Sequence, residues 1–236
     1  MQTAHSEWGL AGIESLRNRA SAFIIVDILS FCTAVDIAVA RGASVYPFAL
    51  GDPVQARAAA AKAGAMLALP RRAAGGQFSL SPASLLTIAP GTRLMLPSPN
   101  GSRLSLATGG VPTFAACLRN AAAVARAARA VAGQGDIAVI PAGERWPDGG
   151  LRPAIEDLIG AGAVLHHLAL PCSPEAEVAR EAYRGVGASL ARLIRDSVSG
   201  RELRDSGFGE DVELAVDECV SGAAPILAEG AYRAEG

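Results

Sequence analysis

The chain has 236 residues, half of them hydrophobic, and a net charge of −2. This length suffices for one large α/β domain or for two small lobes that share a core. Charges are scattered without a basic stripe, and no apolar run reaches the roughly 20 residues that span a bilayer, so we expect neither nucleic acid nor a membrane as partner. Four cysteines without paired spacing, and an N-terminus without a secretory signal, predict a cytoplasmic protein with reduced thiols.

The first strong pattern is the run Phe23-Ile24-Ile25-Val26, which is typical of a strand buried on both faces of a parallel sheet. Asp27 follows where the run ends, then comes a polar turn with Ser30 and Thr33, and then a helical pattern up to Arg41. Open α/β sheets bind ligands in such turns, at the carboxyl ends of their strands. This turn is therefore the first candidate site.

Strand and helix patterns alternate along the rest of the chain, after a weak strand or short helix around 10–16. Strands are predicted at 43–50, 65–69, 93–96, 111–114 and 136–140. Helices are predicted at 53–62, from 81 to 88, at 115–132, 152–159 and 174–195, from 199, and at 210–220, while 163–170 fits a helix or a strand. Residues 70–84 are predicted to form a long surface loop.

The alternation predicts an α/β fold, a three-layer α/β/α arrangement with a mostly parallel sheet. No repeat or low-complexity linker divides the chain, so 1–236 is predicted to be a single domain, with two lobes around one core left open.

Three predicted strands end in polar turns, at 27–33, 98–102 and 143–146. In a parallel sheet these turns would lie along one edge and form one site. Carboxylates there could hold a hard cation such as Mg²⁺, and hydroxyl, amide and backbone groups could bind phosphate oxygens. A metal ion, oriented donors and an arginine suit phosphoryl transfer. The carboxylates are Asp27, Glu144, Glu156 and Asp157, the phosphate-binding groups Ser98, Asn100, Gly101 and Ser102, and the arginine Arg145.

Structural uses of these residue types remain open beside the catalytic ones. An aspartate at a strand end often only caps a helix, and Ser-Pro-Asn-Gly is a good turn signal. The pair Arg71-Arg72 is more typical of a solvated surface than of a phosphate clamp. Cys32 could be a nucleophile, but no arginine follows it at the spacing of a cysteine phosphatase loop, so a packing role is favoured.

Taken in order, several segments resemble the 2-phosphosulfolactate phosphatase family (ComB-like proteins). The similarity covers about residues 23 to 225, and the ordered set of motifs carries it rather than any single one. The segments are Ile25 to Thr33 with Arg41-Gly42-Ala43, Ser98 to Ser102, Leu118 to Ala125, Ala142-Gly143 with Glu156 to Gly162, and Gly207 to Val212.

The resemblance implies Mg²⁺-dependent hydrolysis of 2-phospho-3-sulfolactate to 3-sulfolactate and phosphate. We therefore expect a small phosphorylated or sulfonated acid as substrate and Mg²⁺ as cofactor, with a homodimer left open. The expected catalytic residues are Asp27, Glu144 and Arg145, the substrate-binding residues Ser30, Thr33, Ser98, Asn100, Gly101 and Ser102, and the metal-binding residues Asp27, Glu156 and Asp157. Asp27 could act as a nucleophile or as a metal ligand.

The chain departs from the family pattern at one informative place: Ser30 stands where the family has an arginine. A family glutamate and a family asparagine are also absent from the segments 69–72 and 79–82. Arg72 or Arg145 is expected to replace the missing arginine. The alternative is a non-catalytic protein that binds an anion or a phosphorylated metabolite on the same scaffold.

Overall fold

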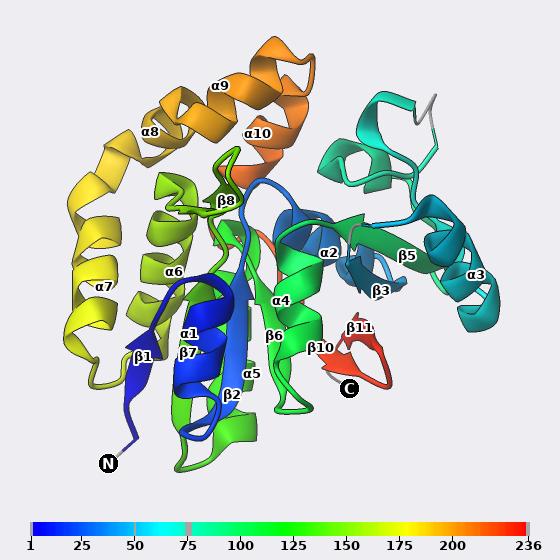
Figure 1. The fold of residues 1–236 in the computed structure, drawn as a ribbon. Coiled ribbons are helices and arrows are strands. Elements are labelled where there is room, and N and C mark those ends of the chain that lie inside the picture. The colour runs from blue at the N-terminus through cyan, green and yellow to red at the C-terminus, as the bar shows by residue number, and fades with distance from the viewer. Residues whose placement is uncertain (1, 50, 74–76, 235–236) are drawn as a thin grey trace.

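The computed structural model describes residues 2–49, 51–73 and 77–234. Within them a nine-stranded sheet runs in the order β1-β7-β2-β6-β10-β11-β3-β5-β4 (Figure 1). Its strands are β1 Ala4–Ser6, β2 Ala20–Val26, β3 Ser44–Ala49, β4 Met66–Leu67, β5 Arg93–Ser98, β6 Thr113–Ala116, β7 Asp136–Pro141, β10 Pro225–Ala228 and β11 Ala231–Ala234. A separate small hairpin pairs β8 Glu144–Arg145 with β9 Leu151–Arg152.

Helices lie on both faces of the sheet, which confirms the predicted α/β layering: α1 and α4 contact one face and α5 the other (Figure 1). The helices are α1 Gly9–Leu16, α2 Phe31–Ala40, α3 Pro53–Ala63, α4 Gly101–Ala107, α5 Ala121–Ala132, α6 Ile155–Leu168, α7 Pro174–Val186, α8 Leu190–Asp196, α9 Val198–Asp205 and α10 Gly209–Ala215. None of them, within the described ranges, combines the length and apolar character needed to cross a bilayer.

The sheet consists of two parallel groups that run in opposite directions. Strands β1, β7, β2 and β6 are parallel to one another, and so are β3, β5 and β4. The hairpin β10–β11 pairs antiparallel with β6 on one side and with β3 on the other, which reverses the direction between the groups. In Figure 1, β5 lies across the direction of β2, so the twist of the sheet turns the carboxyl end of β5 toward that of β2. The prediction of a mostly parallel sheet is thus confirmed, but β5 belongs to the group of strands that runs opposite to β2 and β7.

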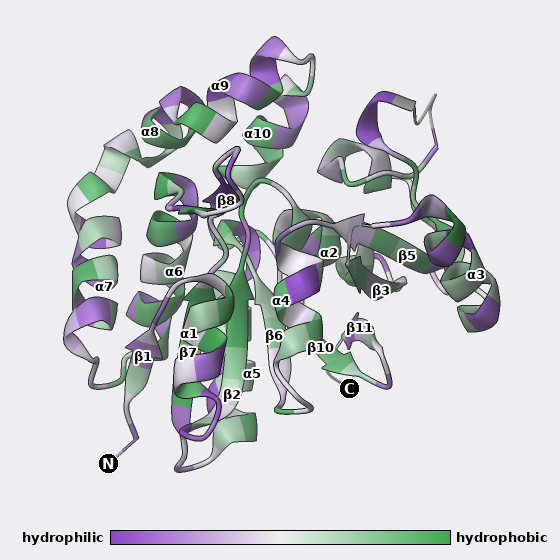
Figure 2. Ribbon diagram, in the orientation of Figure 1, coloured by the Kyte–Doolittle hydropathy of each residue, from purple (hydrophilic) through white to green (hydrophobic). Residues whose placement is uncertain are grey.

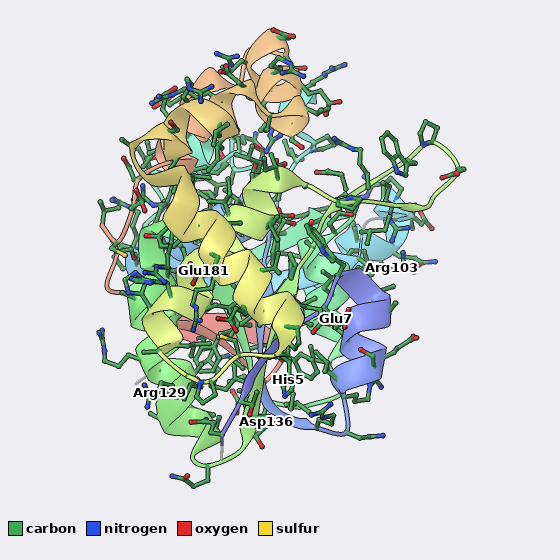
Figure 3. The ribbon with its side chains drawn as sticks, turned by 90° about the vertical axis from the view of Figure 1, so that its left-hand side faces the viewer. His5, Glu7, Arg103, Arg129, Asp136 and Glu181 are labelled. Carbon is green, nitrogen blue, oxygen red and sulfur yellow. The ribbon has the colours of Figure 1, made fainter. Side chains whose placement is uncertain are left out.

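The central strands form the core, as their apolar sequences predict. From Phe23 to Val26 every residue of β2 is buried, and the central strands are coloured as hydrophobic in Figure 2. The outer helix α7 packs on α6 and lies in front of the strands in Figure 3, where Glu181 marks it. At the sheet edge in the same view, His5 Nε2 on β1 lies 3.1 Å from Asp136 Oδ2 on β7.

Some helix boundaries predicted from the sequence agree with the structure, and others do not. The Asp52 side chain caps α3 by accepting from the Val54 N–H, and Gly64 ends that helix with φ 57°, as predicted. The long helix expected at 174–195 is instead broken at Gly187, where φ is 44°. Residues 163–170, which were ambiguous, mostly continue α6. Residue 50 of a predicted strand and residues 74–76 of the predicted loop lie outside the described residues.

Candidate functional site

Asp27 sits at the carboxyl end of β2 and joins two helix beginnings. Its side chain is buried, and Oδ1 accepts a hydrogen bond from the Phe31 N–H at 3.1 Å. Oδ2 accepts from the Gly101 N–H, at the start of α4, at 2.9 Å. The carboxylate therefore connects the turn after β2 with the turn after β5, which comes from the oppositely directed group of strands.

Asp157, near the start of α6, connects the loop after β7 with the loop after β2. Its Oδ1 accepts from the Ile28 N–H and its Oδ2 from the Gly143 N–H, both at 2.8 Å. The residue is only 4% exposed. Because each oxygen is engaged by a backbone N–H, Asp157 fixes the relative position of the turns after β2 and β7.

Asn100 and Glu144 complete the contact between the three turns. The Asn100 side-chain amide donates to Glu144 Oε2 at 3.0 Å, and the Asn100 backbone N–H donates to Ser98 Oγ at 3.3 Å. Residues that are far apart in the sequence thus meet in one place, as expected from the three polar turns.

These residues line a cleft of about 360 Å³. Its wall on the other side comes from α9 and the residues just after it. The lining includes Asp27, Ser30, Ser98, Asn100 and Glu144 from the turns, Arg71 and Arg72 from the loop after β4, and Glu202 and Phe208 from the opposite wall.

Arg71, from the loop after β4, contacts Ser30, the residue that stands where the family has an arginine. Its Nη2 donates to Ser30 Oγ at 2.7 Å and to the Leu80 carbonyl oxygen at 3.2 Å. Its guanidinium also stacks on the Phe208 ring, with Cζ 5.1 Å from the ring centroid. The prediction that Arg71 is a solvated surface residue is therefore wrong, because its side chain is only 19% exposed.

Asp211, at the start of α10, holds Arg71 in place. Arg71 Nε lies 3.5 Å from Asp211 Oδ2. The other carboxylate oxygen accepts from Ser81 Oγ at 2.5 Å and from the Ala83 N–H at 3.1 Å. Among the described residues no hydrogen bond from Arg71 Nη1 is found, and the Arg71 side chain lines the cleft.

The two arginines expected to replace the family arginine lie in different places. Arg72 lines the cleft but is exposed. Arg145 lines a neighbouring hollow of about 200 Å³ together with Trp8 and Arg103, and its Nη1 donates to the Gly149 carbonyl oxygen at 3.0 Å. The structure does not bring Arg145 into the cleft with Asp27.

Two predicted substrate-binding hydroxyls are used inside the protein. Thr33 Oγ1 donates to the Ile28 carbonyl oxygen and Ser102 Oγ to the Leu96 carbonyl oxygen, each at 2.8 Å, and both side chains are fully buried. Gly101 contributes its backbone N–H and the absence of a side chain, because a Cβ there would lie 2.3 Å from a Phe31 ring atom.

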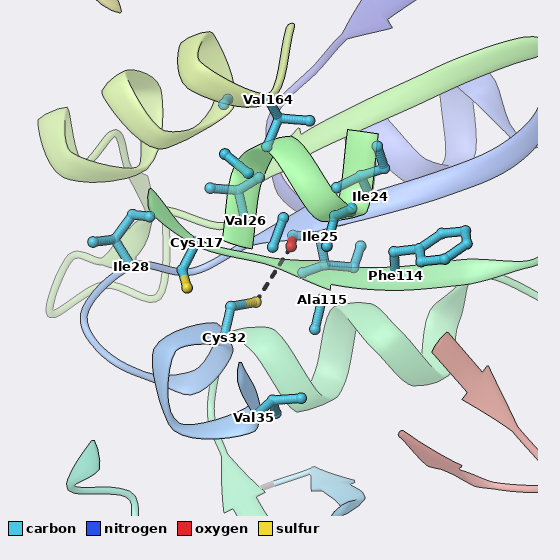
Figure 4. Packing of buried hydrophobic residues seen from close by; sticks show 14 of the residues in the cluster. Ile24, Ile25, Val26, Ile28, Cys32, Val35, Phe114, Ala115, Cys117 and Val164 are labelled. Atoms are coloured by element: carbon cyan, nitrogen blue, oxygen red, sulfur yellow. Dashed lines mark hydrogen bonds between the residues drawn. The ribbon is translucent and has the colours of Figure 1, made fainter. Parts of the chain in front are cut away.

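Cys32 is a packing residue, as favoured from the sequence. Figure 4 shows its side chain pointing into the core, where the thiol donates to the Ile25 carbonyl oxygen at 3.3 Å. Burial raises the pKa of the thiol well above its usual value. A nucleophilic thiolate is therefore not available at this position.

The carboxylates of the site repel one another. Burial, and to a smaller extent the nearby Glu156 charge, raise the pKa of Asp27 to about 6, against the two backbone hydrogen bonds and the Arg71 charge that lower it. Burial and the Asp27 charge raise the pKa of Glu144 to about 7. The pKa of Asp157 is also raised, first by burial and then by Asp27 and Glu156.

Glu156 is the carboxylate best suited to a cation. It is 3% exposed, and no hydrogen bond to its side chain is found among the described residues. No three acidic, histidine or cysteine side chains in these residues are close enough to enclose a metal ion by themselves. Mg²⁺ needs only one or two carboxylates because it keeps several waters, so Glu156, whose charge acts on Asp27 and Glu144, fits this ion together with Asp27.

The comparison with protein families agrees with this geometry. Residues 12–230 match the family described as 2-phosphosulpholactate phosphatase. No curated protein matches the sequence significantly. The sequence-based prediction of the site did not include Arg71, Ser81 or Asp211. All three lie in or beside segments that resemble family motifs, so these motifs could have indicated them.

Proposed function

Because the chain belongs to the 2-phosphosulpholactate phosphatase family, we propose that its cleft hydrolyses a phosphomonoester and releases inorganic phosphate. The observation that carries the proposal is the meeting of Asp27, Asn100, Glu144 and Arg71 around one cleft. Carboxylates beside a guanidinium and an amide supply the charges that phosphoryl transfer requires.

The phosphate is bound by donors that the protein already orients. Arg71 Nη1 donates to a phosphate oxygen, while its remaining contacts with Ser30 and Asp211 keep the guanidinium in place. Asn100 is positioned by Ser98 and Glu144 and adds a neutral donor. Charge-assisted hydrogen bonds from a fixed guanidinium stabilise the charge on the transferring group.

Glu144 is the proposed proton carrier. A carboxyl with a pKa of about 7 exchanges protons efficiently near neutral pH. It accepts a proton from the attacking water as the new P–O bond forms. The old ester P–O bond then breaks with its electron pair on the alcohol oxygen, which takes the proton back from Glu144.

Mg²⁺ is the proposed cofactor, and Asp27 and Glu156 are the residues that would hold it. When bound, such an ion neutralises phosphoryl oxygens and lowers the pKa of a coordinated water. Asp157 instead positions the site, because its two backbone hydrogen bonds fix the turns after β2 and β7 against each other. The family substrate, 2-phosphosulfolactate, is the first compound to assay, with 3-sulfolactate and phosphate as products.

The test is turnover of 2-phosphosulfolactate and p-nitrophenyl phosphate with and without Mg²⁺, in the natural chain and in Asp27→Asn. We expect Mg²⁺-dependent phosphate release that Asp27→Asn abolishes. Asp148→Asn is the matched control, since Asp148 is exposed on the β8–β9 loop and an asparagine keeps its acceptor for the Gly150 N–H. Full activity in Asp27→Asn would refute the assignment.

A second candidate is a non-catalytic binding protein for phosphorylated metabolites, favoured by Ser30 in place of the family arginine. A thermal-shift screen with phosphate and phosphorylated hydroxy acids distinguishes the two. Stabilisation by these ligands without any turnover in the presence of Mg²⁺ would support the binding protein.

A further inference from the structure

An apolar hollow adjoins the catalytic cleft at the carboxyl ends of β3, β4 and β5. It encloses about 290 Å³. Most of its wall is formed by the strand residues Phe48, Leu67 and Pro97, by Leu69 after β4, and by the α3 residues Pro53 and Ala56. Arg71 is the only charged side chain among the described residues that line it.

The hollow and the cleft lie side by side and share part of their walls. Arg71, Leu80 and Pro99 line both of them. A molecule whose phosphate contacts Arg71 in the cleft therefore has the apolar hollow next to it. Apolar hollows with a few polar groups at one end are typical of small-molecule sites.

The charges in the cleft oppose a substrate with several further anionic groups. Its described lining carries the carboxylates Asp27, Glu144 and Glu202 against the guanidiniums of Arg71 and Arg72. Even with one Mg²⁺ held at Asp27, a phosphate ester that also carries a carboxylate and a sulfonate would need more cations than the cleft supplies. An ester with an uncharged, apolar organic part meets no such repulsion.

We propose that the preferred substrate is the phosphomonoester of an apolar alcohol or phenol, with its phosphate at Arg71 and its organic part in the apolar hollow. The inference rests on the proposed phosphatase function and narrows its substrate class. The size of the hollow agrees, since a cavity of about 150 Å³ lined by apolar side chains already binds benzene.

The test is a homologous series of n-alkyl phosphates from ethyl to hexyl, with phenyl phosphate, glycerol phosphate and 2-phosphosulfolactate for comparison. Burial of each methylene predicts a rise in kcat/KM of about fourfold per carbon. Phenyl and hexyl phosphate are expected to exceed glycerol phosphate and 2-phosphosulfolactate. Calorimetric binding of the corresponding alkylphosphonates, which cannot be hydrolysed, should show the same fourfold steps in Kd.

Two neighbouring residues of β4 provide the variant and its control. Leu67 lines the hollow, whereas Met66 is 58% exposed and does not line it, as expected for successive strand residues on opposite faces. Leu67→Asn should flatten the dependence on chain length, and Met66→Asn should leave it unchanged. Competitive inhibition by inorganic phosphate should be the same in both.

The alkyl phosphate and alkylphosphonate series, measured on the unsubstituted protein, test the inference without any variant. Chain-length independence of both kcat/KM and Kd would overturn the inference, and so would faster turnover of 2-phosphosulfolactate than of hexyl phosphate. If alkylphosphonates bind more tightly with length but no ester is hydrolysed, the hollow is supported and the phosphatase function fails.

Discussion

Asp27→Asn should remove activity while making the protein's stability respond differently to pH. The natural side chain has its pKa raised from 3.8 to about 6 by burial. In the unfolded chain the carboxyl ionises near its ordinary pKa, so folding holds a proton that the unfolded state has lost. Without divalent cations, the free energy of unfolding therefore falls between about pH 4 and pH 6 as the pH rises.

The magnitude follows from the shift. Two pH units on one carboxyl correspond to about 3 kcal/mol, of which about 2 kcal/mol accrue between pH 4.5 and pH 8. Asparagine carries no charge and avoids this loss, but its amide NH₂ faces one of the two backbone N–H donors, which costs about 1–3 kcal/mol. At pH 8 these effects nearly cancel, and at pH 4.5 the variant is the less stable form.

The assay is urea unfolding of both proteins at pH 4.5 and pH 8 in EDTA. We expect the difference in unfolding free energy to move by about 2 kcal/mol in favour of Asp27→Asn at the higher pH. A difference that does not change with pH would refute the argument that burial penalises the Asp27 charge.

Further predictions concern the anion site, the close approach of two helices, the clamp between turns and the cofactor. Arg71→Ala should lower kcat/KM about 10- to 100-fold through loss of a charge-assisted hydrogen bond, and an unchanged value would place the phosphate elsewhere. Gly101→Ala should impair turnover because its Cβ would lie 2.3 Å from the Phe31 ring, whereas Gly185→Ala, with nothing within 4 Å, should be neutral in the same assay. Asp157→Ala should lower the unfolding free energy by about 2–6 kcal/mol, since two buried N–H groups lose their acceptors, and a loss below about 1 kcal/mol would contradict this role. Mg²⁺ should raise Tm at pH 8 but not at pH 4.5, where Asp27 and Glu144 hold their protons because their pKa values are raised to about 6 and about 7, and equal shifts at both pH values would argue against binding there.

The β2–α2 unit could be predicted because its signals lie in a short stretch of sequence. A β-branched run followed by a carboxylate and a helical pattern leaves few alternatives, and Asp27 accordingly lies at the site. The same reasoning failed at β6, where Ala115 and Ala116 are strand residues. Alanine favours helices and is depleted in strands, so the sequence around them was predicted to be helical.

The reversal in the sheet depends on long-range pairing that has a weak local signal. The turn of the β10–β11 hairpin places Glu229 and Gly230 at φ 51° and 79°. In a sequence, such turns are predicted from Asn-Gly or Asp-Gly pairs, because these residues tolerate positive φ. A Glu-Gly pair is not a typical hairpin signal. Arg71 was misplaced for a related reason: its partners Ser30 and Asp211 are 41 and 140 positions away, and only folding shows that they meet.

The position of that hairpin has a consequence for how the protein is made. Residues 225–234 are synthesised late but pair between β6 and β3 in the middle of the sheet. During translation the two groups of strands can each begin to form, yet the pairing that joins them must wait until this segment has left the ribosome. We therefore expect nascent chains that end before residue 225 to be inactive, with their two strand groups not yet held in register.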